Sequence, residues 1–257
     1  MQYALVGNKR VEATAGAKGI CTGCGSALIA KCGTKVVHHW AHAKKKDCDP
    51  WWENETEWHR NWKALFPEEC REVVHRDENG EIHRVDIKTS SGTFIEIQHS
   101  AITDVERLSR EQFYKNLVWI VDGQPFFDNF RICHPLPAPD SEIAQDLVWH
   151  KAEWGMLGTM GGMAFKRSEN LEADGLVLMA DRRELDREIP KTYRGHHQYV
   201  WKKPRSTWLA ATVPVYIDFG GSCLFRLELY GGYLPALCRV SKAQFIEDCQ
   251  KKNRDEN

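Results

Sequence analysis

Residues 83–100 constrain the fold of this chain more than any other stretch. Two runs rich in strand-forming residues, 83–88 and 94–100, are separated by Thr-Ser-Ser-Gly, which is typical of a turn. We therefore expect a hairpin. Glu96 and Gln98 are two residues apart on its second strand, so their side chains share a face, and the hairpin can bring Asp86 opposite Glu96.

Two carboxylates that converge on one strand face repel each other and are costly to desolvate. A hard divalent cation removes that cost, and oxygen ligands suit it. The hairpin therefore predicts a Mg²⁺ (or Mn²⁺) site at Asp86 and Glu96. The alternative is that both acids face solvent on a hairpin with one polar face.

Residues 51–66 precede the hairpin and have helical periodicity. Four apolar residues recur at helical spacing: Trp58, Trp62, Leu65 and Phe66. Glu55, His59 and Lys63 form a second stripe beside them, and Pro67 ends the helix. Such i, i+4 pairs also simply stabilise helices, which is the alternative interpretation of the second stripe. Glu57 lies on another side of the helix and is a second choice.

The elements around the hairpin complete a pattern. Residues 72–75 read as a strand, 103–114 as a helix and 117–121 as a buried strand. The order helix, three strands, helix, strand, with an acid on the first helix, resembles the PD-(D/E)xK nuclease superfamily. This resemblance implies an α/β fold with a restriction-endonuclease-like core. Gln98 stands where the superfamily most often has Lys.

Cysteines and histidines near the N-terminus form a metal-binding pattern of the type C-x2-C-x14-H-x2-H. The predicted zinc ligands are Cys21, Cys24, His39 and His42. The spacing between the histidines is shorter than usual, so three nearby residues are possible substitutes: Cys32, His38 and Cys48. A module of this size buries little core, and a structural Zn²⁺ would supply stability. Free thiols and surface histidines are the alternative.

Taken together, these motifs resemble the CoiA-like competence nuclease family. The matching elements are Cys21/Cys24, residues 39–42, residues 55–59 with Lys63, residues 84–86 and residues 95–100. The resemblance implies DNA processing in competence or recombination, with single-stranded or branched DNA as possible partners. It does not specify which DNA structure is cut.

The chemistry implied by this resemblance uses six residues: Glu55, His59, Lys63, Asp86, Glu96 and Gln98. Asp86 and Glu96 would hold the metal, with the carbonyl of residue 97 as a further ligand. Gln98 can orient a water molecule but carries no charge, so Lys63 is the candidate for the missing cation. His59 would hold the water or contact the phosphate, and Glu55 would bind a second metal or fix His59.

Charge and composition suggest three parts. Residues 1–50, the zinc module, carry eight Lys/Arg against three Asp/Glu, whereas residues 51–139, the nuclease-like core, carry ten against sixteen. Lys44, Lys45 and Lys46 are either a phosphate contact or a solvated run. Residues 140–257 form an α+β region of unknown role, with a helix at 142–154, antiparallel strands over 199–240 and a closing helix at 241–251.

Several classes are excluded by the sequence pattern. We expect a cytoplasmic protein without a membrane span or disulfide framework, because apolar runs are short, no secretory segment is recognisable and the nine cysteines are an odd number. The expected function is that of a metal-dependent DNA endonuclease or exonuclease. The alternatives are a catalytically inactive DNA-binding protein with a nuclease-like fold and, as a weaker interpretation, a protein-interaction scaffold.

Overall fold

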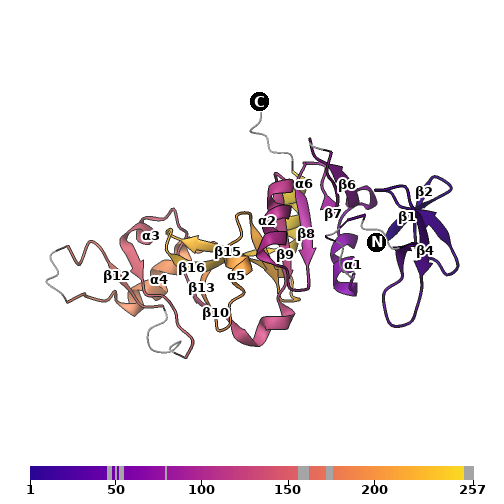
Figure 1. Ribbon diagram of the computed structural model, residues 1–257. Coiled ribbons are helices and arrows are strands. Elements are labelled where there is room, and N and C mark those ends of the chain that lie inside the picture. Colours follow the sequence, from indigo (N-terminus) through magenta and orange to yellow (C-terminus); the bar gives the residue numbers. More distant parts are fainter. Residues whose placement is uncertain are drawn as a thin grey trace. The chain divides into compact units, whose positions relative to one another are not determined.

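The computed structural model describes residues 1–44, 48–49, 51, 55–78, 80–155, 162–171 and 176–251 (Figure 1). The described chain is mixed α/β and divides into two compact units. The first unit comprises Met1–Ile120 and the segment that begins at Ile246, and the second comprises Val121–Phe245. The finer division at residues 50 and 139 stays a prediction.

The first unit begins with a five-stranded antiparallel sheet in the order β2-β1-β3-β4-β5. Its strands are β1 (Tyr3–Val6), β2 (Lys9–Glu12), β3 (Lys18–Ile20), β4 (Ala27–Lys31) and β5 (His39–His42). A small cluster around Ala4, Leu28 and Trp40 forms its core, and the cluster includes Cys21. Gly19 is required here, because a Cβ atom at this position would lie 2.9 Å from the Cβ of Ala4.

The rest of the first unit has the predicted element order. Its elements are α1 (Glu57–Ala64), the 3-10 turn η1 (Glu68–Cys70), β6 (Arg71–Arg76), β7 (Ile82–Lys88), β8 (Phe94–Gln98), α2 (Asp104–Phe113) and β9 (Leu117–Asp122). The four strands are arranged in the order β9-β8-β7-β6. Every residue of β8 and β9 is buried, which is typical of central strands covered on both faces.

Helix α1 is shorter than predicted, and its inner face includes residues of both predicted stripes, since Trp62, Phe66, His59 and Lys63 are all buried. Thr56 is its N-cap, with a side chain that accepts a hydrogen bond from the backbone N–H of His59, so Glu55 precedes the helix. The predicted apolar stripe is only partly buried, since Leu65 is 47 % exposed. His59 and Lys63 are buried beside Trp62. Ionic and hydrogen-bonded partners allow these two polar side chains to face inward.

The second unit contains five neighbouring antiparallel strands of the nine-stranded sheet, in the order β10-β13-β16-β15-β14. The strands are β10 (Phe130–Pro135), β13 (His196–Trp201), β14 (Val215–Asp218), β15 (Cys223–Tyr230) and β16 (Leu234–Ser241). The smaller elements are η2 (Gln124–Asn129), α3 (Glu142–Asp146), β11 (Leu147–Trp149), β12 (Ala164–Lys166), α4 (Arg182–Thr192) and α5 (Ser206–Leu209). The predicted antiparallel set over 199–240 is therefore confirmed.

The helix predicted over residues 142–154 is wrong beyond Asp146. The chain leaves α3 and forms β11, which pairs with β12. Leu147 and Trp149 alternate into the core formed with Leu136 and Ala164, and this tertiary packing outweighs helical propensity. The closing helix is confirmed as α6 (Lys242–Gln250), where the hydroxyl of Ser241 accepts a hydrogen bond from Gln244 N–H at 3.0 Å.

None of the described helices is long and apolar enough to cross a membrane.

Candidate functional site

Four side chains converge at the edge of the N-terminal sheet: Cys21, Cys24, His42 and Cys48. Their ligand atoms all lie within 4.8 Å of one another. Cys21 and Cys24 flank a tight turn in which the N–H of Gly25 donates to the carbonyl of Cys21. Gly25 adopts a φ of 69°, a conformation that glycine tolerates best. His42 is the last residue of β5.

The distances within this cluster suit a tetrahedral ion. The sulfurs of Cys21 and Cys48 are 3.7 Å apart, and the sulfur of Cys24 lies 3.4 Å from Nε2 of His42. Zinc bonds of about 2.3 Å to sulfur and about 2.0–2.1 Å to nitrogen give tetrahedral edges of about 3.8 and about 3.6 Å. All four residues could therefore hold one zinc ion.

Cys48 occupies the position for which His39 was predicted, and the reason lies in strand geometry. Residues 39 and 42 are three apart on β5, and side chains on a strand alternate between its faces, so both cannot point to one ion. Nδ1 of His39 instead lies 2.9 Å from the carbonyl oxygen of Val37. Cys32, another predicted substitute, donates to the carbonyl of Ala13.

The cysteines of the cluster differ in acidity. Burial alone would raise the pKa of Cys24, but hydrogen bonds from Ser26, Cys48 and His42 lower that pKa to about 6. Burial and the two neighbouring cysteines raise the pKa of Cys48 to about 12. The thiolate of Cys24 is thus formed readily, whereas the thiolate of Cys48 needs a cation beside it.

A second site lies in the same unit, in a cavity of about 60 Å³. All six residues predicted to be catalytic line it: Glu55, His59, Lys63, Asp86, Glu96 and Gln98. Four further charged residues join them: Asp49, Glu72, Arg84 and Arg110. We call this cavity the carboxylate pocket. Glu57, the second choice for the helix acid, is exposed and does not line it.

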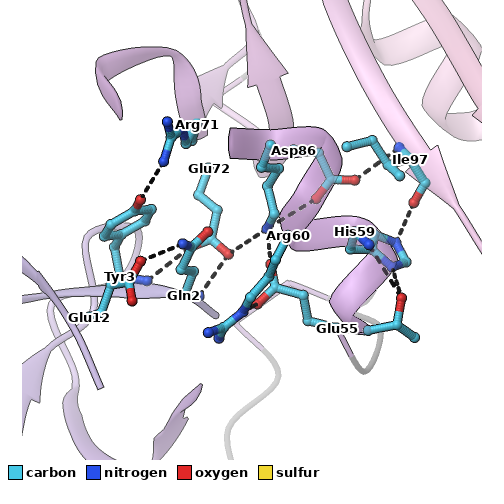
Figure 2. Close-up of polar contacts among 12 residues, drawn as sticks. Gln2, Tyr3, Glu12, Glu55, His59, Arg60, Arg71, Glu72, Asp86 and Ile97 are labelled. Carbon is cyan, nitrogen blue, oxygen red and sulfur yellow. Dashed lines mark hydrogen bonds and ion pairs between the residues drawn. The ribbon is translucent and has the colours of Figure 1, made fainter. Parts of the chain in front are cut away.

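Lys63 lies at the centre of the carboxylates and is 2 % exposed. Its ammonium group forms an ion pair with Glu55 and lies 3.1 Å from Glu72 and 3.6 Å from Asp86 (Figure 2). Burial alone would lower the pKa of Lys63, but these carboxylates raise it well above its ordinary value. Lys63 therefore carries its charge throughout the physiological range.

Glu72 enters the pocket from β6 and was not predicted. Its carboxylate accepts hydrogen bonds from the backbone N–H groups of Gln2 and Tyr3, at 2.8 and 3.2 Å, so it also ties β1 to β6 (Figure 2). Although burial would raise the pKa of Glu72, Lys63 holds it far below its ordinary value. Glu72 has a φ of 46°, a left-handed backbone conformation that is uncommon for residues other than glycine.

Asp86 and Glu96 face each other as the hairpin predicts. The register pairs Ile87 with Ile95, which brings the preceding Asp86 level with Glu96. One oxygen of Asp86 accepts a hydrogen bond from Ile97 N–H at 2.9 Å. The Asp86 side chain is 23 % exposed, so this acid lies within reach of solvent.

Glu96 is buried and lies 2.7 Å from the guanidinium group of Arg110. Burial raises the pKa of Glu96 to about 8, and the charges of Asp86 and Asp49 add to this effect, whereas Arg110 opposes it. The ion pair with Arg110 therefore does not fully compensate the negative charge at this position.

The two remaining predicted residues are held by hydrogen bonds. Nε2 of His59 contacts the carbonyl oxygen of Ile97, and its Nδ1 lies 3.1 Å from the hydroxyl of Thr56 (Figure 2). Gln98 is 1 % exposed, and its amide nitrogen donates to the carbonyl oxygen of Ser100 at 3.3 Å. His59 thus orients the carbonyl of residue 97, which was itself predicted to be a metal ligand.

The charges that line the carboxylate pocket do not balance. Five carboxylates contribute to it, while the side chains of Lys63, Arg84 and Arg110 are its permanent cations. Counting side chains alone, two formal negative charges remain when all the acids are ionised; the amino group of Met1 also lines the pocket, and burial lowers its pKa. A divalent cation would neutralise both, and carboxylate and carbonyl oxygens are the ligands that Mg²⁺ prefers.

Arg84 and Asp49 connect the cysteine cluster to the carboxylate pocket. The guanidinium group of Arg84 lies 3.5 Å from the sulfur of Cys21 and 3.3 Å from the hydroxyl of Thr22, and it also lines the pocket. Asp49, the residue after Cys48, accepts a hydrogen bond from Arg84 N–H at 2.9 Å. The two candidate sites therefore share one residue of β7, Arg84.

The fold and these sites define a class: a mixed α/β chain with an N-terminal Cys/His cluster that could bind zinc and a carboxylate-rich pocket. Residues 7–50 match the family model for competence protein CoiA, N-terminal domain. The resemblance to CoiA-like competence proteins is therefore confirmed over this segment, which contains all four cluster residues. Neither the curated proteins nor the solved structures include a match to the chain.

Among the pocket residues that were not predicted, Glu72 could have been inferred from the sequence through strand pairing. Val73 pairs with Val85, so a hairpin of β6 and β7 places Glu72 level with Asp86. Asp49 and Arg110 reach the pocket through long-range contacts, and nothing in their local sequence indicates this. Lys44 is exposed, whereas Lys45 and Lys46 lie outside the described residues.

Proposed function

We propose that this protein is a metal-dependent DNA nuclease of the CoiA-like type, with a restriction-endonuclease-like core and a role in competence-related DNA processing. The observation that carries the proposal is the meeting of Asp86, Glu96 and the helix-adjacent Glu55 in one pocket with uncompensated negative charge. The match of residues 7–50 to a competence-protein domain supports DNA as the substrate.

Asp86 and Glu96 would hold Mg²⁺ or Mn²⁺, and the carbonyl of Ile97 is a further oxygen on the same strand. The bound metal would lower the pKa of a water molecule and neutralise charge that develops on the scissile phosphate. The pocket fits such an ion because its acids outnumber its cations and burial raises the pKa of Glu96.

The chain's own residues would perform the positioning. The hydrogen bond from Ile97 N–H fixes one oxygen of Asp86, and His59 fixes the carbonyl of Ile97. Lys63 supplies the permanent positive charge that Gln98 lacks, because it reaches the acid cluster from α1. Gln98 would orient the attacking water through its amide, and Glu55 would keep Lys63 and Arg60 in place.

The test is a cleavage assay with single-stranded, linear duplex and branched DNA in Mg²⁺ or Mn²⁺. We expect cleavage by the wild-type protein and a loss of about a hundredfold or more in Asp86→Asn and Glu96→Gln. Glu78→Gln is the matched control, because Glu78 is 90 % exposed and paired with an exposed lysine. Absence of cleavage with every substrate and metal would refute the proposal.

One observation favours the alternative of an inactive DNA-binding protein. Lys63 and Arg110 already form ion pairs with the acids, and Gln98 replaces the usual lysine. In that case DNA binding would persist in Asp86→Asn and Glu96→Gln, and no divalent metal would support cleavage. Binding of Mn²⁺ to the wild-type protein, measured by calorimetry, separates the two functions without relying on activity.

A further inference from the structure

The second unit presents a group of positive charges around one tryptophan. We call it the Trp154 surface and define it by Trp154, Arg131 and Lys202. Strands β10 and β13 pair side by side, with Arg131 opposite Val200 (Figure 1). Lys202 is two residues beyond Val200 and donates its backbone N–H to Asn129. By strand alternation, Arg131 and Lys202 emerge on the same face.

Trp154 is held over this face by the segment before it. The N–H of Ala152 donates to the side-chain oxygen of Gln198, a fully buried residue of β13, at 3.0 Å. The guanidinium carbon of Arg131 lies 4.6 Å from the centre of a Trp154 ring, and the ammonium nitrogen of Lys202 lies 5.3 Å away. The indole is half-buried, and both cations are exposed.

Lys203 and Arg205 follow Lys202 in the chain but are not part of this surface. The guanidinium group of Arg205 stacks over Phe126 at 4.8 Å, and Phe126 stacks on Trp201 with ring centres 4.7 Å apart. By strand alternation, Trp201 faces away from Lys202. The surface therefore combines a partly accessible aromatic ring with one guanidinium group and one ammonium group.

Among the described residues, no carboxylate forms an ion pair with these two cations. Glu153 and Asp128 are exposed nearby in the chain, yet neither pairs with them. Several other exposed cations of this unit are paired, as with Arg194 and Asp140 or Lys191 and Glu188. Two like charges that share one ring without a counter-charge repel each other, so this arrangement indicates an anionic partner.

The ring selects among anionic partners. A surface cation–π contact is worth about 0.5–1 kcal/mol, whereas stacking of a base on an aromatic ring contributes about 1–3 kcal/mol. A base can therefore displace Lys202 from the ring, and Lys202 and Arg131 can turn to the flanking phosphates. Bases in a duplex are stacked and cannot do this, so an unpaired strand fits best.

We propose that the Trp154 surface binds single-stranded DNA, with a base on Trp154 and phosphates on Arg131 and Lys202. This inference goes beyond the proposed nuclease function, because it concerns the second unit and requires no cleavage.

The first test is binding of a labelled oligo(dT) to the full-length protein with Asp86→Asn in all samples, which prevents cleavage. We expect Trp154→Ala to weaken binding by about 5- to 150-fold, whereas Trp154→Phe keeps most of the affinity. The pair Arg131→Ala/Lys202→Ala should reduce the slope of log affinity against log salt by about 1.4. Arg187→Ala is the control, because Arg187 is an exposed arginine of the same unit, on α4, and is not one of the residues that define this surface.

The second test places the contact directly. An oligonucleotide containing 5-iodouracil, which crosslinks to stacked aromatic rings, should crosslink at Trp154 in the wild-type protein. Crosslinks confined to the first unit would overturn the proposal. This readout stays decisive even if DNA binding by the first unit hides the change in affinity. Equal loss in Trp154→Ala and Trp154→Phe also overturns it, as does competition by polyglutamate that matches competition by oligo(dT). Thermal transitions equal to that of the wild type verify that each variant is folded.

Discussion

A buried lysine ammonium is stable only when carboxylates surround it. The buried carboxylates around Lys63 depend in the same way on its positive charge. Glu55, Glu72 and Asp86 share this one cation, and the first two are nearly inaccessible to solvent. Removing the cation would leave Glu72 and Asp86 without the ammonium group that they share, while Glu55 also pairs with Arg60 at 3.0 Å. Lys63 therefore has a structural role that exists whether or not the pocket performs chemistry.

We expect Lys63→Met to lower the free energy of unfolding of the first unit by about 3–5 kcal/mol, because it breaks buried ion pairs from one side. Millimolar Mg²⁺ should restore part of this loss, since a divalent ion can replace the missing charge. Urea denaturation with and without Mg²⁺ measures both effects. Lys115→Met is the control: its pair with Glu78 is exposed, and its removal should cost less than about 0.5 kcal/mol. A Lys63→Met protein as stable as the control would contradict this account.

At the scale of elements, the N-terminal module shows how a strand decides a ligand set. His39 and His42 belong to the same short strand, and only His42 joins the cysteines. Cys48 completes the set from the segment that follows β5. The spacing of the histidines suggested a conventional pair, but the two-residue period of the strand does not allow it.

This geometry makes a direct prediction about zinc content. Wild-type protein and His39→Ala should each contain about one zinc per chain, whereas Cys48→Ser should lose zinc to a weak chelating resin. Metal analysis of the purified proteins gives the answer. Cys32→Ser is the matched control, because Cys32 is a nearby cysteine outside the cluster. Loss of zinc from His39→Ala but not from Cys48→Ser would reverse the assignment.

Local patterns predicted most of the elements that form the carboxylate pocket. The hairpin of β7 and β8 follows from strand-forming residues around a turn, and Asp86 and Glu96 follow from its register. The complete burial of Lys63 on α1 did not follow, because a lysine is buried only where carboxylates compensate its charge. Its compensation comes from Glu72 and Asp86, which are distant in sequence.

The same limit applies to Asp49 and Arg110. Their partners lie on β7 and β8, and a single sequence contains no local pattern that would reveal such pairs. The helix predicted over residues 142–154 failed for a related reason, since the pairing of β11 with β12 depends on residues that follow it in the chain.

At the scale of the whole molecule, the two units place their candidate functions in different parts of the chain. The cysteine cluster and the carboxylate pocket both belong to the first unit, and the Trp154 surface belongs to the second. Within the first unit, Arg84, Asp49 and Glu72 connect the N-terminal sheet with β6 and β7. Loss of zinc should therefore disturb the pocket as well as the module.

We expect hydrogen exchange to report this coupling. Chelation of zinc should increase amide exchange in residues 1–44 and also in β6 and β7, because Arg84 and Glu72 lose fixed partners. Strands β13, β15 and β16 of the second unit should exchange as before. Mass spectrometry of peptides from chelated and zinc-supplied protein measures this directly. Exchange that increases only within residues 1–44 would show that the two candidate sites are independent.

The left-handed backbone at Glu72 restricts evolution at this position. Asparagine accepts such a conformation more readily than most residues, but its shorter side chain would not span the same gap to the amides of Gln2 and Tyr3 and to Lys63. Glycine would relieve the backbone and leave all three donors without an acceptor. Descendants of this chain should therefore retain glutamate here even after any enzymatic activity has been lost, so an invariant acid at position 72 would be a sign of architecture and no proof of catalysis.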